Sequence, residues 1–193
     1  MITHIQGKLI EKNPTDVVID CNGVGYQLHI SLNTFSQIPD KEHLKLYTHL
    51  QIKEDAHTLF GFSSIAEREI FRLLLSVSGI GASTARTMLS SLTPKQVREG
   101  IASGDVALIQ SIKGIGAKTA QRVIIDLKDK ILKIYDIDEV SVTKDNTNKN
   151  EALSALEVLG FAKKQAERVV DKIMISQPDA SVETIIKQAL KNL

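Results

Sequence analysis

Hydrophobic residues follow two different periods along the chain, and the change occurs near Ser63. Before Ser63, short segments rich in β-branched and aromatic residues partly alternate with polar ones, which is typical of β-strands. The predicted strands are Ile5–Glu11, Asp16–Asp20, Val24–Ile30, Leu44–Ile52 and Ala56–Phe62. Asn22-Gly23 predicts a hairpin turn, because a type I′ turn needs positive φ at both central residues. Several short strands within about sixty residues favour a small closed or nearly closed barrel.

From residue 63 to residue 135 the apolar positions recur at helical spacing, as Ile70 and Leu74 illustrate. Thr93 and Pro94 predict a helix start, with threonine as the N-cap and proline in the first helical position. We expect four or five short helices in this part of the chain.

Residues 136–149 are polar with few large apolar side chains, and we expect a flexible linker there. Residues 150–193 return to helical periodicity in three segments, which Gly160 and the pair Gln177-Pro178 separate. The predicted fold class is therefore α+β, with a barrel at 1–63, a helical module at 64–135 and a three-helix domain at 150–193.

Two stretches of the helical module repeat each other. SVSGIGASTARTM at 76–88 and SIKGIGAKTAQRV at 111–123 align at an offset of 35 residues. The alignment gives nine identical positions in a window of twenty residues. Two copies are too few for a solenoid, so the repeat predicts a duplicated helix–turn–helix unit.

The Gly-Ile-Gly core of each repeat suits a helix–turn–helix that binds phosphate. We expect a helix to end at the first glycine, the isoleucine to enter the core, and the second glycine to begin the next helix. The first N–H groups of that helix have no internal partner and suit a phosphate oxygen, and the missing side chain lets a ligand approach. Two cations spaced four apart on one face of the second helix add charge. The expected phosphate-binding residues are Gly79, Ile80, Gly81, Ser83 and Thr84 in the first repeat and Gly114, Ile115, Gly116, Ala117, Lys118, Thr119 and Arg122 in the second. The structural alternative is a tight turn between packed helices.

The charge distribution favours phosphate binding over that alternative. The whole chain has a net charge of +1, but residues 63–135 carry 11 basic and 6 acidic residues. Basic clustering beside paired turns points to a nucleic-acid backbone. Backbone contacts read no bases, so binding should not depend on sequence.

Composition excludes several other classes. A single cysteine, Cys21, allows neither an internal disulfide nor a cysteine-based zinc site. No apolar run has the length of a membrane span, and the start has no signal-peptide pattern. We expect a cytoplasmic protein without cofactor or bound metal.

The sequence also speaks against an enzyme. A nucleotide-binding phosphate loop needs glycine directly before its lysine, but Ala117 precedes Lys118. A base-excision glycosylase would need a Gly/Pro-rich loop and a catalytic aspartate, but residues 123–135 contain neither glycine nor proline. We expect a non-enzymatic DNA-binding protein. A nuclease or glycosylase, and a generic duplex-binding adaptor, remain as alternatives.

The paired stretches resemble helix–hairpin–helix DNA-binding motifs, and MITHIQGKLIEK, NGVGYQLHIS and EDAHTLFGF add specificity. Over its full length the chain resembles the RuvA family, the Holliday junction-binding subunits of bacterial branch-migration complexes. The resemblance implies an OB-fold barrel, a tandem helix–hairpin–helix domain and a UBA-like three-helix domain. It implies a homotetramer that holds a four-way junction open and recruits a RuvB-type hexameric ATPase in recombination, DNA repair and the SOS response. A RuvC-type junction resolvase would be a further partner.

The resemblance assigns two more sets of residues. Glu54 and Asp55 match an acidic pin at the centre of the tetramer, although a solvated hairpin turn would also explain them. The positions expected to contact the ATPase are Leu156, Leu159 and Leu190, although a packed helical core would also explain them. One departure concerns Ser83, which stands where the family often has a lysine.

Overall fold

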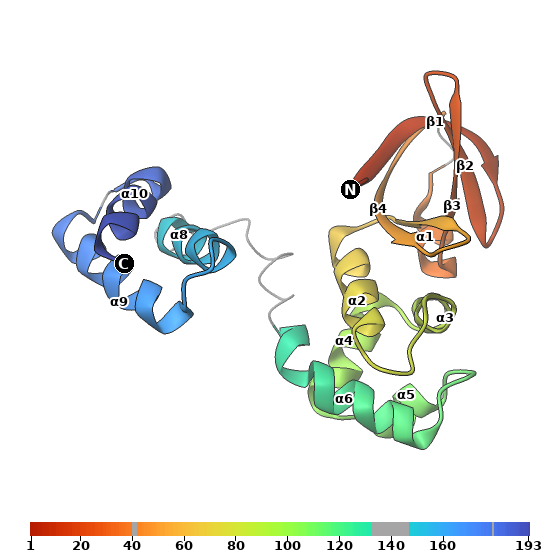
Figure 1. The fold of residues 1–193 in the computed structure, drawn as a ribbon. Coiled ribbons are helices and arrows are strands. Elements are labelled where there is room, and N and C mark those ends of the chain that lie inside the picture. Colours follow the sequence, from red (N-terminus) through yellow and green to blue (C-terminus); the bar gives the residue numbers. More distant parts are fainter. Residues whose placement is uncertain (40–41, 133–146, 179) are drawn as a thin grey trace. The chain divides into compact units, whose positions relative to one another are not determined.

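The computed structural model describes residues 1–39, 42–132, 147–178 and 180–193. The chain divides into two compact units, Met1–Asp138 and Glu139–Leu193. The first unit holds a β-barrel and a set of helices, and the second is helical (Figure 1). This mixture of elements confirms the predicted α+β class.

Five strands form the closed barrel that the alternating pattern predicts. Their order around the barrel is β1-β2-β3-β5-β4, and only the β3–β5 pair is parallel, at His29 and Phe60. Inward-facing side chains such as Val17, Ile19 and Leu28 are fully buried. The strands are β1 His4–Lys12, β2 Asp16–Cys21, β3 Val24–His29, β4 His43–Ile52 and β5 His57–Phe62.

The turn between β2 and β3 has the conformation that its sequence predicts. Asn22 and Gly23 both adopt positive φ, 54° and 89°. Cys21 and Val24 pair directly on either side of them, as a two-residue hairpin loop requires. This turn sets the register that sends the alternating residues of both strands into the barrel.

A short helix between β3 and β4, α1 Leu32–Gln37, was not predicted. Six residues are too few to show a helical period. The side chain of Ser31 caps it by accepting a hydrogen bond from Thr34 N–H at 2.9 Å. The helix matters because it carries hydroxyl groups toward the helical part of the chain.

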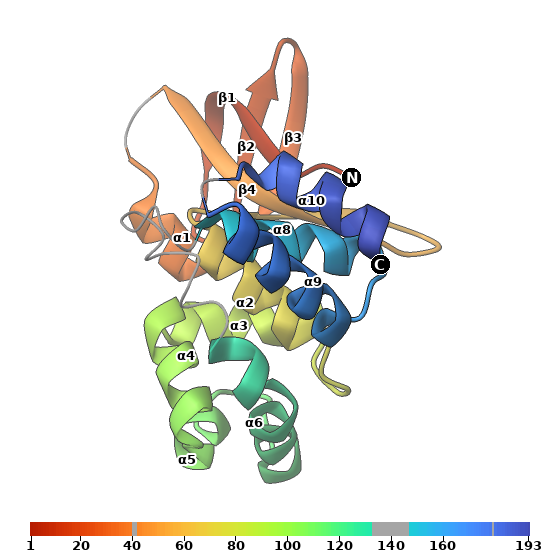
Figure 2. The same cartoon turned by 90° about the vertical axis from the view of Figure 1, so that its left-hand side faces the viewer.

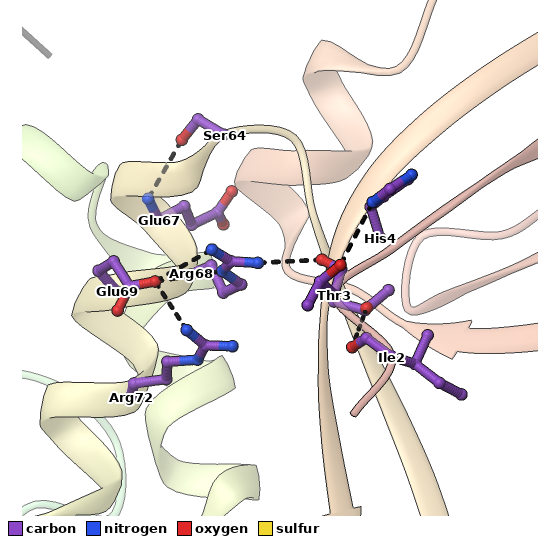
Figure 3. Close-up of polar contacts among 9 residues, drawn as sticks. Ile2, Thr3, His4, Ser64, Glu67, Arg68, Glu69 and Arg72 are labelled. Atoms are coloured by element: carbon purple, nitrogen blue, oxygen red, sulfur yellow. Dashed lines mark hydrogen bonds and ion pairs between the residues drawn. The ribbon is translucent and has the colours of Figure 1, made fainter. Parts of the chain in front are cut away.

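A buried carboxyl group connects the barrel with the helices. Glu67 is completely buried near the start of α2 Ile65–Leu75, and its two oxygens accept hydrogen bonds from Ser31 Oγ at 2.5 Å and Thr34 Oγ1 at 2.6 Å. Thr34 Oγ1 accepts in turn from Ser63 N–H at 3.1 Å. The side chain of Ser64 caps α2 through Glu67 N–H, as Figure 3 shows. These interlocked bonds satisfy each of the buried polar side chains involved.

Arg68 on α2 adds a second connection to the barrel side of the chain. Arg68 donates to the carbonyl oxygen of Thr3 at 2.9 Å, and Glu69 accepts from both Arg68 and Arg72 (Figure 3). On the neighbouring strand, desolvation lowers the pKa of His49, and Arg72 lowers it further. We therefore expect this imidazole to be neutral at pH 7 and compatible with the cationic pair.

Among the described residues of the first unit, five helices follow the barrel, in agreement with the expected four or five. Both views place α2 directly against the barrel and α5 and α6 farther from it (Figures 1 and 2). One apolar core runs through this region, from Phe60 and Phe71 near the barrel to Ile131. The helices after α2 are α3 Ala82–Ser91, α4 Pro94–Ser103, α5 Val106–Gln110 and α6 Ala117–Ile131. The predicted start at Thr93 is confirmed, because a capping box with Gln96 stands there.

The second unit contains the three helices that the sequence predicts: α8 Thr147–Val158, α9 Lys163–Ser176 and α10 Val182–Asn192. Gly160 ends the first of them with a φ of 96°. The helix α8 begins at Thr147 and so takes in the last three residues of the expected linker. The rest of that linker, 136–146, lies outside the described residues.

Replacing Glu67 with alanine should destabilise the protein by about 2–4 kcal/mol, because the hydroxyl groups of Ser31 and Thr34 would be buried without an acceptor. Urea denaturation followed by circular dichroism measures this change. Glu99→Ala is the matched control, since Glu99 is exposed and ion-paired only at the surface, and it should change stability by less than about 0.5 kcal/mol. Equal effects of the two substitutions would contradict a structural role for the buried network.

Candidate nucleic-acid interface

The two repeats fold into matching hairpins. Helix α2 leads through a turn into α3, and α5 leads through the same kind of turn into α6. In each turn the isoleucine N–H donates to the carbonyl three residues earlier, Ile80 to Val77 at 3.0 Å and Ile115 to Ile112 at 3.1 Å. The predicted duplicated helix–turn–helix unit is therefore present.

The first glycine of each hairpin serves the backbone. Gly79 and Gly114 have φ values of 94° and 91°, which side-chain-bearing residues rarely adopt. The expectation that a helix ends at these glycines is wrong, because α2 ends at Leu75 and α5 ends at Gln110. Capping serines follow, and both glycines come later in the turn, where the chain reverses its direction.

The isoleucine between the glycines anchors each hairpin. Ile80 and Ile115 are 6% and 5% exposed and belong to the main core. The preceding Val77 and Ile112 are also buried. Two buried apolar side chains thus anchor each turn to the core. The isoleucine enters the core, as the sequence predicts, and the backbone of the turn remains on the outside.

Nothing within the folded chain requires the second residue of each pair, Gly81 or Gly116, to be a glycine. Gly81 and Gly116 are the N-caps of α3 and α6, with φ of −91° and −83°, which any residue can adopt. A Cβ atom added at either position would meet nothing within 4 Å. Neither backbone strain nor internal crowding therefore calls for glycine here. Close approach of a ligand from outside is the remaining physical reason.

The helix starts behind these glycines offer hydrogen-bond donors to such a ligand. No side chain caps α3 or α6, so the N–H groups of their first turns keep their hydrogen-bonding capacity. Ser83, Ala117 and Lys118 are exposed in these turns, and Thr84 and Thr119 are half-buried. Each turn combines the positive end of a helix dipole with open N–H groups, an arrangement that suits a phosphate oxygen.

Cations surround the second hairpin. Lys118 and Arg122 are exposed on α6, and Arg122 reaches back to the carbonyl of Ser78 at 3.5 Å. Sequence reasoning missed Lys113, although it directly precedes Gly114 and is exposed. None of these three has an ion pair among the described residues. Their charge is therefore available to an anionic ligand.

The carboxyl groups of Glu54 and Asp55 lie at the tip of the β4–β5 hairpin. Lys53 N–H donates to the carbonyl of Ala56 at 2.8 Å and closes a two-residue loop around them. Both acidic residues are exposed. This geometry fits an acidic pin, and it fits the simpler hairpin turn as well.

The expected partner contacts in the second unit differ in exposure. Leu156 is fully buried in the three-helix core, so the expectation that it contacts a partner is wrong. Leu159 and Leu190 are 57% and 46% exposed. Sequence reasoning missed Val158 and Ile175, which are 85% and 83% exposed, because helical periodicity does not separate a surface apolar residue from a core one.

Comparison with known proteins agrees with the geometry. The family described as RuvA N terminal domain matches residues 1–61, a SAM-like helix-hairpin-helix tandem matches 71–129, and the RuvA C-terminal domain matches 147–193. A protein of Flavobacterium psychrophilum named Holliday junction branch migration complex subunit RuvA is 68% identical over 193 residues, which cover all of both chains. The protein of the same name from Christiangramia forsetii is 66% identical over the same full length, and that from Cytophaga hutchinsonii is 50% identical over 99% of each chain.

The chain belongs to the RuvA family.

The RuvA matches cover the barrel, both hairpins and the three C-terminal helices. They confirm the resemblance drawn from GIGAST, GIGAKT and EDAHTLFGF. Within the part of the chain that the structure describes, no three His, Cys, Asp or Glu side chains are grouped to hold a metal ion. No helix in these same residues has both the length and the apolar character for crossing a membrane.

The two glycines of each RuvA hairpin should respond differently to the same substitution. Gly79→Ser and Gly114→Ser should each destabilise the chain by about 1–2 kcal/mol, because serine would be forced into left-handed backbone geometry. Gly81→Ser and Gly116→Ser should leave stability within about 0.5 kcal/mol, because serine is a good N-cap and its Cβ meets open space. Urea denaturation of the four variants measures the difference. A similar loss in all four would show that the fold itself needs the second glycines.

Proposed function

We propose that this protein binds four-way Holliday junction DNA by its structure and not its sequence, and that it serves branch migration in recombination and DNA repair. The observation that carries the proposal is the pair of uncapped helix starts, each behind a glycine that the fold itself does not need. The RuvA family, whose relatives are named as subunits of the branch migration complex, supplies the biological context.

The proposed DNA contacts are the phosphate-binding residues predicted at 79–84 and 114–122. Each hairpin presents backbone N–H groups, and the second adds the cations Lys118 and Arg122. Such contacts grip the sugar–phosphate backbone and leave base edges unread. Two such sites per chain can follow one duplex arm without sequence preference.

A homotetramer would explain how a chain of net charge +1 binds DNA. Residues 63–135 alone carry a net charge of +5, from 11 basic and 6 acidic residues. Four such segments on one face would make a large positive surface. Four copies also suit the four arms of a junction.

We propose that the protein is non-catalytic and that a RuvB-type hexameric ATPase supplies the motor. The barrel at 1–63 would place the pin, the module at 64–135 would hold DNA, and the linker at 136–149 would tether the domain at 150–193 to that motor. A RuvC-type junction resolvase would act on the same complex. The named relatives are subunits of a complex, which supports the need for a partner.

The purified protein should prefer a synthetic four-way junction to a linear duplex of equal length in a gel-shift titration at moderate salt. Gly81→Leu combined with Gly116→Leu should weaken junction binding by roughly tenfold or more, because the side chains would block the N–H groups from phosphate. The serine variants at the first glycines serve as stability controls, since they leave the helix starts open.

Equal affinity of the parent protein for both DNAs would leave only a generic helix–hairpin–helix adaptor. Cleavage of labelled junction by the pure protein with magnesium would instead favour the enzyme alternative.

Charge removal at the pin should relax junction selectivity. Glu54→Gln with Asp55→Asn should tighten binding to linear duplex, because two carboxylates near the crossover would otherwise repel continuous phosphates. Competition between junction and duplex measures the ratio of affinities. An unchanged ratio would reduce these residues to an ordinary hairpin turn.

The exposed leucines of the second unit are proposed to contact the ATPase. Leu159→Ser with Leu190→Ser should reduce co-sedimentation of a RuvB-type ATPase, because both side chains offer apolar surface. Leu156→Ser would unfold the domain instead and is not informative. Unaltered ATPase binding by a folded double variant would exclude this surface.

A further inference from the structure

The two hairpins are not electrostatically equal. At the offset that aligns their glycines, every cation of the second hairpin corresponds to an uncharged hydroxyl residue in the first. The equivalent pairs are Lys113 with Ser78, Lys118 with Ser83, and Arg122 with Thr87. Between residues 78 and 87 the first hairpin has one cation, Arg86. On its own, the first hairpin therefore has much less charge for phosphate than the second.

An open groove of about 540 Å³ lies beside the first hairpin, between α3 and the barrel. Gly81, Ser83 and Arg86 line it on the hairpin side. The barrel side includes Lys53 and Thr58, which come from either end of the β4–β5 loop. Figure 2 shows this loop projecting on the same side of the molecule as the α2–α3 turn.

In the described part of the chain, the two cations of the groove have no carboxylate partner. Among the described residues, no ion pair involves Lys53 or Arg86. Arg86 donates a long hydrogen bond of 3.4 Å to the carbonyl of Thr15. By contrast, Glu69 holds both Arg68 and Arg72 in the neighbouring helix. The groove cations are therefore not committed to holding the fold together.

The remaining wall suits a polynucleotide strand. Gln51 and Thr58 are paired across β4 and β5 and offer hydrogen-bonding groups. The half-buried ring of His29 also lines the groove, and it lies against the largely buried ring of Phe60, with centroids 5.9 Å apart. The cations, amide and hydroxyl groups of this groove can bind a sugar–phosphate backbone.

We propose that this groove is a further DNA-backbone site, in which Lys53 of the barrel and Arg86 of α3 supply the positive charge that the first hairpin lacks. The strand held at Gly81 would continue along the groove toward Lys53, which directly precedes Glu54 of the acidic pin. The inference rests on the proposed function, because it assumes that the first hairpin binds DNA. It adds the barrel as a source of phosphate contacts.

The sign of the charge changes sharply along this path. Lys53 would attract the DNA backbone, whereas Glu54 and Asp55, the next two residues of the protein chain, would repel it. A DNA strand that leaves the first hairpin would thus be bound as far as Lys53 and repelled at Glu54 and Asp55. Attraction followed at once by repulsion gives a physical way to bend a strand at a crossover.

The test measures junction affinity as a function of salt for Lys53→Ala with Arg86→Ala. We expect affinity to fall roughly tenfold or more and the slope of log K against log salt to decrease by about one for each phosphate that the variant no longer neutralises. Lys95→Ala with Lys8→Ala is the matched control, because it removes the same charge from exposed lysines outside the groove. It should change affinity and slope much less.

A rescue separates this site from a general loss of charge. Ser83→Lys places in the first hairpin the residue that the second hairpin has at the equivalent position. In the Lys53→Ala, Arg86→Ala background it should restore most of the missing junction affinity. If the groove variant and the control bind alike, or if Ser83→Lys rescues nothing, the groove site is wrong.

Measurements on the parent protein distinguish the proposed junction-binding function from the groove inference. If it prefers the junction and Lys118→Ala weakens binding while the groove variant does not, the function stands and the groove inference fails. If the parent shows no junction preference, the proposed function fails first. Repeating Lys53→Ala with Glu54→Gln and Asp55→Asn tests for an indirect effect through the pin, and a loss that disappears there would overturn direct phosphate contact.

Discussion

The buried carboxyl group of Glu67 holds the two parts of the first unit together. It lies on the helix that leads into the first hairpin, and it accepts hydrogen bonds from Ser31 and Thr34 of the α1 segment that connects two barrel strands. A buried polar group without its partner costs a sizeable fraction of a domain's stability. The barrel and α2 are therefore held in one arrangement, which also fixes where the Glu54-Asp55 hairpin tip and the groove lie relative to the first hairpin.

The two glycines of each hairpin have different roles. Gly79 and Gly114 allow the chain to turn, and Gly81 and Gly116 leave the helix starts uncovered. The apolar side chain between each pair packs into the core, so the turn is rigid while its backbone remains open. A rigid, exposed set of N–H groups would bind a phosphate at a smaller ordering cost, which is the benefit of preorganisation.

Positive charge is distributed unevenly between the two hairpins. The second hairpin carries its own cations, and the first stands beside a barrel that presents Lys53. A duplicated motif need not keep the same residues in both copies when a neighbouring domain can supply the missing charge. The weak net charge of the chain is then compatible with DNA binding, because position matters more than the total.

Local conformations and the repeat could be predicted from the order of residues alone. Alternation indicated the barrel strands, Asn22-Gly23 their tight turn, and the repeated Gly-Ile-Gly both hairpins, because each depends on backbone preferences of neighbouring residues. Only the folded chain shows which apolar and charged residues contact one another. Leu156 lies inward, and Glu67 and the groove of Lys53 and Arg86 join residues far apart in the chain. Such pairings follow from packing and long-range hydrogen bonds, which leave no period in the sequence.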